Sequence, residues 1–207
     1  MNRQEDSRPD SPRHAFIVGI VATVASSLIL EAARVFDLVG AGPCTEAIIA
    51  FLLIRIYPEP RSLRWSFKSV ALLLAAGLLL ALGWIGAIGW WQVSSRFTEW
   101  TQYPFYFIVI GFISAVVTAP LFEEKVVRHL LLCGAARITN TLFASILVSA
   151  LFALAHPGNR IWSFIVSVLL CWLAIKWGAN SFQRAIVHGT LNLMVMLWHL
   201  AGGSGKF

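Results

Sequence analysis

Three apolar stretches of this chain carry pairs of residues spaced four positions apart. The pairs are Glu124 with Arg128, Phe152 with His156, and His188 with Asn192. On a helix, side chains four positions apart lie on the same face, so three helices would each present one pair. A further acid, Glu123, directly precedes Glu124 and points about 100° away from it around the helix axis.

Together these residues supply two carboxylates, two imidazoles, a guanidinium and a carboxamide, which are the groups that peptide-bond hydrolysis needs. That reaction requires a base that activates water, donors that hold the oxyanion and an acid for the departing amine. Glu123 suits the base, because a carboxylate in a low-dielectric site beside a second acid binds its proton more tightly. Glu124, paired with Arg128, would stay ionised and fix the geometry.

The two histidines and the asparagine would complete this reaction. His156 would assist the water or carry a proton, while His188 and Asn192 would donate hydrogen bonds to the oxyanion. Taken singly, an ion pair, an interfacial histidine or an asparagine between helices is more often structural. The prediction of a catalytic site therefore depends on the three stretches occurring together.

The composition places these residues in an integral membrane protein. The 207-residue chain has a mean hydropathy of +0.75 with 58% hydrophobic and 13% charged residues, more apolar surface than a water-soluble domain can bury. Its formal charge of +6 fits Lys and Arg in short cytoplasmic loops. No basic stripe with interleaved aromatic residues indicates a nucleic-acid partner. Cys44, Cys133 and Cys171 lie in apolar runs without CxxC spacing, which indicates buried thiols and no disulfide or zinc framework.

The pattern of apolar segments predicts an all-α polytopic membrane protein with about eight transmembrane helices, the last four forming the catalytic core. The predicted regions are a disordered cytoplasmic tail (1–14), N-terminal membrane helices (15–103), the core (104–200) and a short tail (201–207). Pro120 is expected to separate an apolar helix from a short helix at 122–137. The distribution of Lys and Arg between the two sides of the membrane alone favours seven spans. We expect eight, because eight spans would place Glu123 and His156 on the same side of the membrane.

The three stretches also resemble the motifs of a known family. EEKVVR (123–128), FALAH (152–156) and HGTLN (188–192) are similar to EExxxR, FxxxH and HxxxN of the CPBP (CAAX protease and bacteriocin-processing) family, also called the Abi family. These proteins are intramembrane endopeptidases and include the type II CAAX prenyl endopeptidases. The resemblance covers about residues 104–200.

This resemblance implies a role for each matching residue. Glu123 would be the catalytic glutamate, Glu124 and Arg128 would support it, and His156 would be the second catalytic group. His188 and Asn192 would form the oxyanion side, and Phe152 is predicted to contact the substrate. Lys125 and His129 depart from the family pattern, which is usually apolar at the first position and often glycine at the second, so substrate preference is less defined than the chemistry.

We expect no metal cofactor, with a zinc-dependent metalloprotease as the alternative. Glu123, His156 and His188 could provide a His2Glu set of ligands, although the chain contains no HExxH motif. The expected partners are membrane lipid and a membrane-associated peptide, such as a prenylated protein, a bacteriocin precursor or a sorting signal. The expected location is the bacterial inner membrane, with the N-terminus in the cytoplasm.

Two other classes of function remain open on the sequence. A proton-coupled transporter would also bury Glu, Arg and His, but it should show internal repeats, and we find none. A non-catalytic membrane scaffold or immunity protein would keep the fold and tolerate the loss of Glu123. Substrate identity and oligomeric state are not predicted.

Overall fold

The computed structural model describes residues 12–59, 64–89 and 104–201, and all regular structure in these ranges is helical. The elements are α1 (Pro12–Val35), α2 (Ala41–Ile56), α3 (Phe67–Trp84) with η1 (Ile85–Gly89), α5 (Phe105–Ile113), η3 (Ser114–Thr118), α6 (Ala119–Glu123), η4 (Glu124–Leu131), α7 (Leu132–Ile138), α8 (Thr141–Leu154), α9 (Arg160–Lys176) and α10 (Ser181–Leu200). The predicted all-α class is confirmed. The predicted tails lie largely outside the described residues, although α1 already begins at Pro12.

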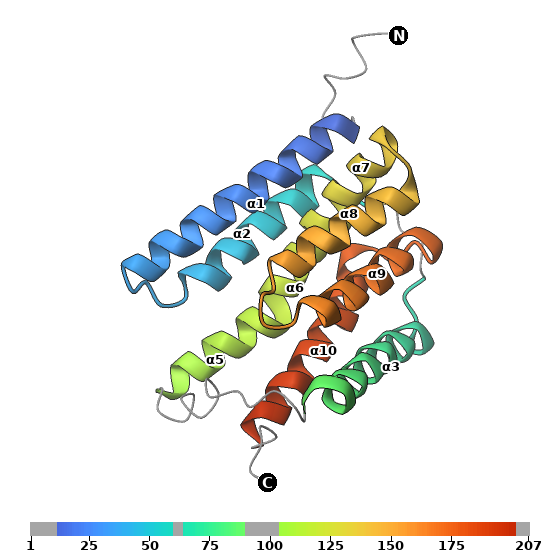
Figure 1. Ribbon diagram of the computed structural model, residues 1–207. Coiled ribbons are helices and arrows are strands. Elements are labelled where there is room, and N and C mark those ends of the chain that lie inside the picture. The colour runs from blue at the N-terminus through green and yellow to red at the C-terminus, as the bar shows by residue number, and fades with distance from the viewer. Residues whose placement is uncertain (1–11, 60–63, 90–103, 202–207) are drawn as a thin grey trace.

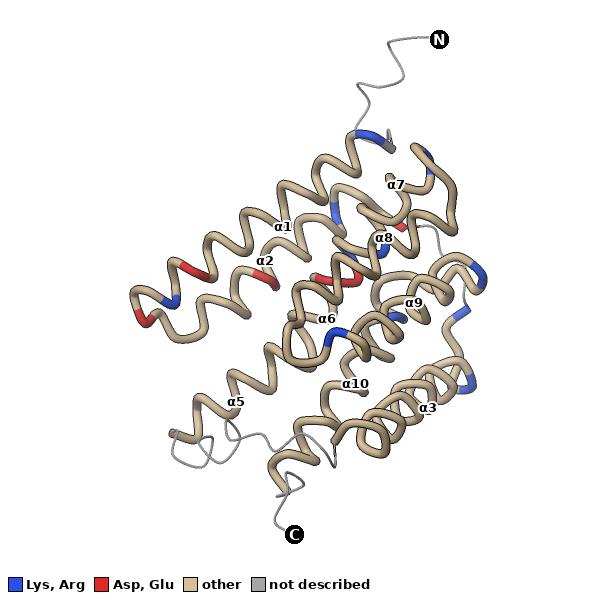
Figure 2. The backbone as a smooth tube through the Cα atoms, in the orientation of Figure 1, with Lys and Arg blue, Asp and Glu red and all other residues tan. Residues whose placement is uncertain are grey.

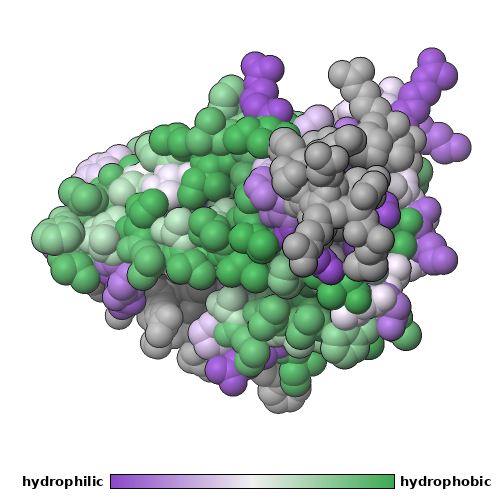
Figure 3. Space-filling model, turned by 90° about the horizontal axis from the view of Figure 1, so that it is seen from above, coloured by the Kyte–Doolittle hydropathy of each residue, from purple (hydrophilic) through white to green (hydrophobic). Residues whose placement is uncertain are grey.

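The described helices have the length and apolar character of membrane spans. Three of them, Arg13–Val35, Phe67–Gly89 and Phe105–Ile138, are long and apolar enough to cross a bilayer, and Thr141–Leu154 is a shorter apolar helix. Their outer faces carry large apolar side chains, such as Val21 and Leu28 of α1. Figure 3 shows a broad apolar area on one face of the molecule. The chain is therefore an all-α membrane protein.

The predicted break at Pro120 is wrong. Residues 105–138 form one continuous helix of 34 residues, in which the α-helical pieces alternate with the π-helical stretches η3 and η4. A proline inside an α-helix lacks an N–H group and clashes with the preceding turn. Here Pro120 lies in the first turn of α6, directly after the wider turn of η3, so the helix continues. The fourth and fifth predicted helices are therefore one helix.

This long helix places the acidic pair in the middle of the molecule (Figures 1 and 2), at the end of α6 and the start of η4. Helix α8 then runs back along α7 and η4. With 14 residues it is about 21 Å long, shorter than the ~30 Å hydrocarbon core of a bilayer. The loop after α8, which contains His156, therefore returns to the depth of the glutamates, and α9 folds back along α8.

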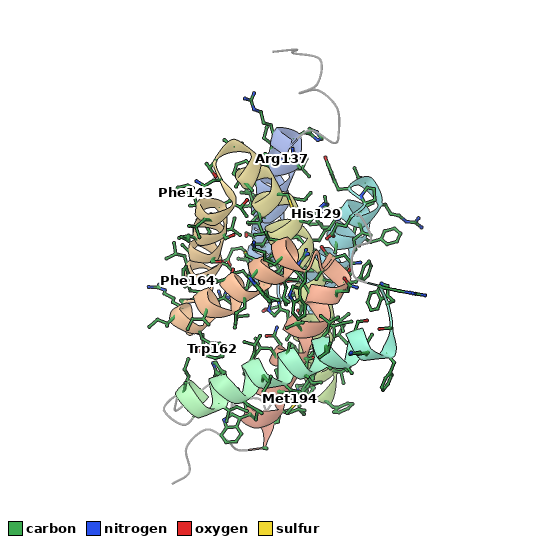
Figure 4. All side chains as sticks on the ribbon, turned by 90° about the vertical axis from the view of Figure 1, so that its right-hand side faces the viewer. His129, Arg137, Phe143, Trp162, Phe164 and Met194 are labelled. Carbon is green, nitrogen blue, oxygen red and sulfur yellow. The ribbon has the colours of Figure 1, made fainter. Side chains whose placement is uncertain are left out.

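Helix α10 packs between α3 and the long helix (Figure 1). Two glycines permit this close approach. A Cβ atom on Gly77 of α3 would lie 2.6 Å from the carbonyl oxygen of Val187, and one on Gly189 of α10 would lie 2.3 Å from the carbonyl oxygen of Val116 in η3. On the side of α9, Trp162 points toward α3 (Figure 4), where a Cβ on Gly83 would lie 3.0 Å from its ring.

The close packing at Gly189 generates a first prediction. Replacing Gly189 with alanine is expected to destabilise the protein by ~1–3 kcal/mol, because the new methyl group would overlap backbone atoms that cannot rotate away. The measurement is the midpoint of thermal unfolding in detergent. The matched control is Gly86→Ala, since a Cβ there meets no atom within 4 Å. Equal midpoints for Gly189→Ala and wild type would contradict the described contact.

Candidate active site

The site is built around a fully buried carboxylate. Glu124 in η4 is 0% exposed, and its Oε1 atom lies 3.2 Å from Nη1 of Arg128, the ion pair predicted from their spacing. Nδ1 of His188 donates a hydrogen bond to the same oxygen at 3.1 Å. The second oxygen, Oε2, accepts a hydrogen bond from Nε of Arg184 at 3.2 Å. The long helix and α10 are therefore joined through one carboxylate.

Arg184 was not predicted as a site residue, because the sequence places it among the basic residues that flank the apolar segments. It lies in the first turn of α10 and is 2% exposed. Besides the Glu124 side chain, its guanidinium donates to the Glu124 carbonyl oxygen at 3.1 Å and to Oγ of Ser181 at 3.1 Å. Its spacing was a usable signal, since Arg184, His188 and Asn192 follow one another at intervals of four and share one helix face.

Phe152 connects the first and second motifs. The guanidinium carbon of Arg128 lies 4.1 Å from the centroid of the Phe152 ring, a cation–π arrangement. Phe152 also contacts His156 at the other end of its own motif, with ring centroids 4.3 Å apart. Phe152 therefore packs between the buried ion cluster and His156, and its predicted contact with substrate stays a prediction.

The two histidines present one ring nitrogen each toward the space above this cluster. The Nδ1 atom of His156 donates to the carbonyl oxygen of Phe152 at 2.7 Å, which leaves Nε2 for water or substrate. In His188, Nδ1 donates to Glu124, and Nε2 lies 3.7 Å from Oε2 of Glu123. A carboxylate behind the ring fixes its tautomer and orientation, so His188 is held facing Glu123.

Asn192 is fixed by the long helix. Its Nδ2 atom donates to the carbonyl oxygen of Ala115 in η3 at 2.8 Å. A carboxamide nitrogen carries two hydrogens, so one N–H remains for a further acceptor. The π-helical stretch thus sets the position of Asn192 as well as the close approach of α10.

Four of the six predicted catalytic residues meet at one cavity of about 400 Å³. They come from the long helix, α10 and the loop after α8 and are Glu123, His156, His188 and Asn192. The other two, Glu124 and Arg128, lie beneath this cavity and do not line it. Glu123 is partly accessible, with 24% of its side chain exposed. The spatial convergence of the three motifs, which the chemistry requires, is therefore present.

A second cavity of about 500 Å³ adjoins the first. It lies between α1, α2, the long helix and α8, and most of its lining is apolar, with the exceptions of Thr23, Ser26, Ser27, His156 and the two glutamates Glu46 and Glu123. Glu46 accepts a hydrogen bond from Thr118 at 2.9 Å. Both cavities share Glu123, Phe152, Ala155 and His156. The candidate base is thus accessible from a polar side and from an apolar side.

A metal ion was the alternative cofactor. Within ranges 12–59, 64–89 and 104–201, no group of three His, Cys, Asp or Glu side chains is arranged to hold a metal ion. The proposed ligand set of Glu123, His156 and His188 does not form such a group.

Comparison with known proteins agrees with the motifs. Residues 104–194 match a family model described as Rce1-like: type II CAAX prenyl endopeptidase Rce1-like. The match begins at α5 and includes every motif position, which confirms the predicted resemblance. No curated protein and no solved structure gives a significant match.

The buried cluster generates a second prediction. Replacing Glu124 with glutamine is expected to cost ~3–5 kcal/mol of folding free energy, because Arg128 and Arg184 would stay buried without their counter-charge. The measurement is the free energy of unfolding in mixed micelles. Glu31→Gln is the control, since Glu31 pairs with Arg34 on an exposed face of α1 at 4.0 Å and surface pairs contribute little. A Glu124→Gln variant as stable as the control variant would contradict the role of Glu124.

Proposed function

We propose that this chain is an intramembrane endopeptidase that hydrolyses a peptide bond with water activated by Glu123. The family matched by residues 104–194 is one of CAAX-type endopeptidases. The observation that carries the proposal is the cavity that Glu123 shares with His156, His188 and Asn192. Of these, Glu123 is a partly accessible carboxylate, beside a second carboxylate that two arginines neutralise.

In the proposed mechanism, Glu123 takes a proton from a water molecule that Nε2 of His156 orients. The resulting hydroxide attacks the carbonyl carbon of the scissile bond, and the carbonyl π electrons move to oxygen. Asn192, through its remaining N–H, and His188, when protonated at Nε2, donate hydrogen bonds to this oxyanion. When the C–N bond breaks, Glu123 returns its proton to the departing amine. The oxyanion electrons re-form the carbonyl as the bond breaks, so the products are a carboxylic acid, which then loses its proton to solvent, and an amine, and the glutamate ends in its starting state.

The placement of Glu124 supports the role of His188. An imidazolium is stabilised by a carboxylate at its other nitrogen, as in other histidine-based sites. Glu124 itself is held by Arg128 and Arg184, so it stays ionised and does not compete with Glu123 as a base. Two adjacent glutamates would thus have different roles because their surroundings differ.

The second cavity supports an apolar, membrane-associated substrate. A peptide whose scissile bond lies at Glu123 and His156 could place an apolar side chain or attached lipid in the 500 Å³ cavity, where its transfer from water or lipid is favourable. Prenylated proteins, bacteriocin precursors and C-terminal sorting signals all offer such segments. We propose this class of substrate without choosing among its members.

We also propose that the chain lies in the bacterial inner membrane with its N-terminus in the cytoplasm. Lys and Arg gather at the end of the bundle where the chain begins (Figure 2), with Arg55, Arg137 and Lys176 in the last turns of their helices. Short cytoplasmic loops carry such an excess of basic residues.

The test of this function is cleavage of a panel of apolar peptides by the purified protein in detergent or liposomes. Glu123→Gln is expected to lower kcat by at least ~100-fold, and His156→Ala and His188→Ala by a similar factor, because general acid–base groups contribute about that much. Glu123→Gln and His156→Ala should unfold at temperatures close to that of wild type, whereas His188→Ala removes a hydrogen bond of the buried Glu124 and should unfold at a somewhat lower temperature.

Glu31→Gln serves as the control for this assay and should cleave like wild type. Well-folded variants at Glu123 that cleave as fast as wild type would overturn the protease assignment and favour a scaffold or immunity role. A chelator series on the same assay addresses the zinc alternative. Activity that persists in chelator supports the glutamate mechanism, whereas activity lost in chelator and restored by zinc contradicts it.

A further inference from the structure

A third carboxylate lies at the edge of the buried cluster, in the segment directly after α2. Glu59 precedes the region matched by the family model and is far from the motifs in sequence. Its Oε2 atom accepts a hydrogen bond from the backbone N–H of Ser181 at 2.9 Å, and its Oε1 accepts from the Ser181 hydroxyl and from Nζ of Lys125 at 3.2 Å. Only 12% of its side chain is exposed.

Glu59 also contacts the arginine that holds Glu124. Nη2 of Arg184 lies 3.4 Å from Oε2 of Glu59, while Nε of the same guanidinium lies 3.2 Å from Oε2 of Glu124. Arg184 is therefore held between two carboxylates. A planar guanidinium bound on two edges has little freedom to rotate, so Glu59, together with the carbonyl oxygen of Ala179 that accepts from Nη1, fixes where Arg184 meets Glu124.

The Glu59 carboxylate is surrounded by basic side chains that favour its ionised form. Lys125, which departs from the family motif, is 1% exposed, and Nδ1 of His129 lies 3.9 Å from Oε1 of Glu59. Burial alone would raise the pKa of Glu59, but the charges of Arg184, His129 and Lys125 outweigh burial and lower it. Glu59 is thus ionised at neutral pH and offsets the charge of two buried cations.

We propose that Glu59 is a positioning residue of the active site, which acts on His188 through Arg184 and Glu124. This inference rests on the proposed peptidase function. In this arrangement Glu59 fixes Arg184, Arg184 fixes the Glu124 carboxylate, and that carboxylate holds His188 with Nε2 facing Glu123. Glu59 lies in the N-terminal part of the protein, which therefore contributes to the site. Lys125 also contacts Glu59 but takes no part in the contacts that lead from Glu59 to His188.

The test compares Glu59→Gln, Glu59→Asp and Lys125→Met in the full-length protein. Glu59→Gln is expected to lower kcat on the order of tenfold with little change in KM, as removal of outer partners of catalytic groups does elsewhere. Lys125→Met should keep kcat within about twofold of wild type, because Arg184 and Ser181 still hold Glu59. Glu59→Asp restores the charge and should recover part of the lost kcat.

A second readout does not depend on catalysis. Histidine-selective ¹⁵N NMR in micelles reports the hydrogen bond at Nδ1 of His188, with His188→Ala used to assign the signal. Glu59→Gln is expected to shift this signal, and Lys125→Met to leave it in place. An unchanged His188 signal in Glu59→Gln, or equal kcat losses in Glu59→Gln and Lys125→Met, overturns the inference. A wild-type protein that cleaves no peptide, while the NMR shift is still seen, contradicts the peptidase function and leaves the positioning contact supported.

The ionisation of Glu59 also predicts how stability depends on pH. A carboxyl group with a lowered pKa in the folded state stabilises the fold fully above its unfolded pKa of ~4.3, and this stabilisation is lost as the pH falls through the folded value. The difference in unfolding temperature between wild type and Glu59→Gln should therefore stay constant from about pH 7 to pH 5 and shrink below about pH 4. A difference that already disappears above pH 5 would contradict this assignment.

Discussion

The burial of the Glu124 carboxylate is the constraint on which the rest of the site depends. A charge removed from water costs several kcal/mol unless opposite charges and hydrogen bonds surround it. Arg128 supplies one opposite charge from the same helix, whereas Arg184 and His188 come from α10. The two helices can therefore not move apart without exposing or orphaning a charge. The same contact that compensates Glu124 sets the orientation of His188 toward Glu123.

The helices are shaped to bring these groups together inside an apolar bundle. The 105–138 helix carries Glu123 and Glu124 near its middle. Because α8 is too short to cross a bilayer, its C-terminal end lies at the depth of these glutamates. Gly189 lets α10 approach the π-helical stretch η3, so that Asn192 can donate a hydrogen bond to the carbonyl oxygen of Ala115. The result is a polar cavity beside an apolar one, joined at Glu123 and His156. A site with both characters suits a hydrolytic reaction on an apolar peptide.

Local spacing in the sequence predicted the parts of the site that lie on one helix. The Glu124–Arg128 pair follows from their interval of four, and the structure contains this ion pair. The meeting of the three motifs at one cavity was expected from the chemistry and the resemblance and does not follow from local spacing. The continuous helix through Pro120 was not predicted, because a widened turn before a proline leaves no clear trace in composition. The contact between Glu59 and Lys125 was not predicted either, because it joins residues 66 positions apart. Such pairings depend on tertiary packing.

In the proposed mechanism, the scissile peptide bond lies in the cavity between Glu123, His156 and His188. The most direct measurement is an experimental structure of the Glu123→Gln variant with an uncleaved apolar peptide bound. We expect the scissile carbonyl carbon to lie next to the side chain at position 123, with its oxygen toward His188 and Asn192 and an apolar group in the adjoining cavity. A peptide bound elsewhere on the protein, with its carbonyl groups away from that cavity, would contradict the proposed mechanism.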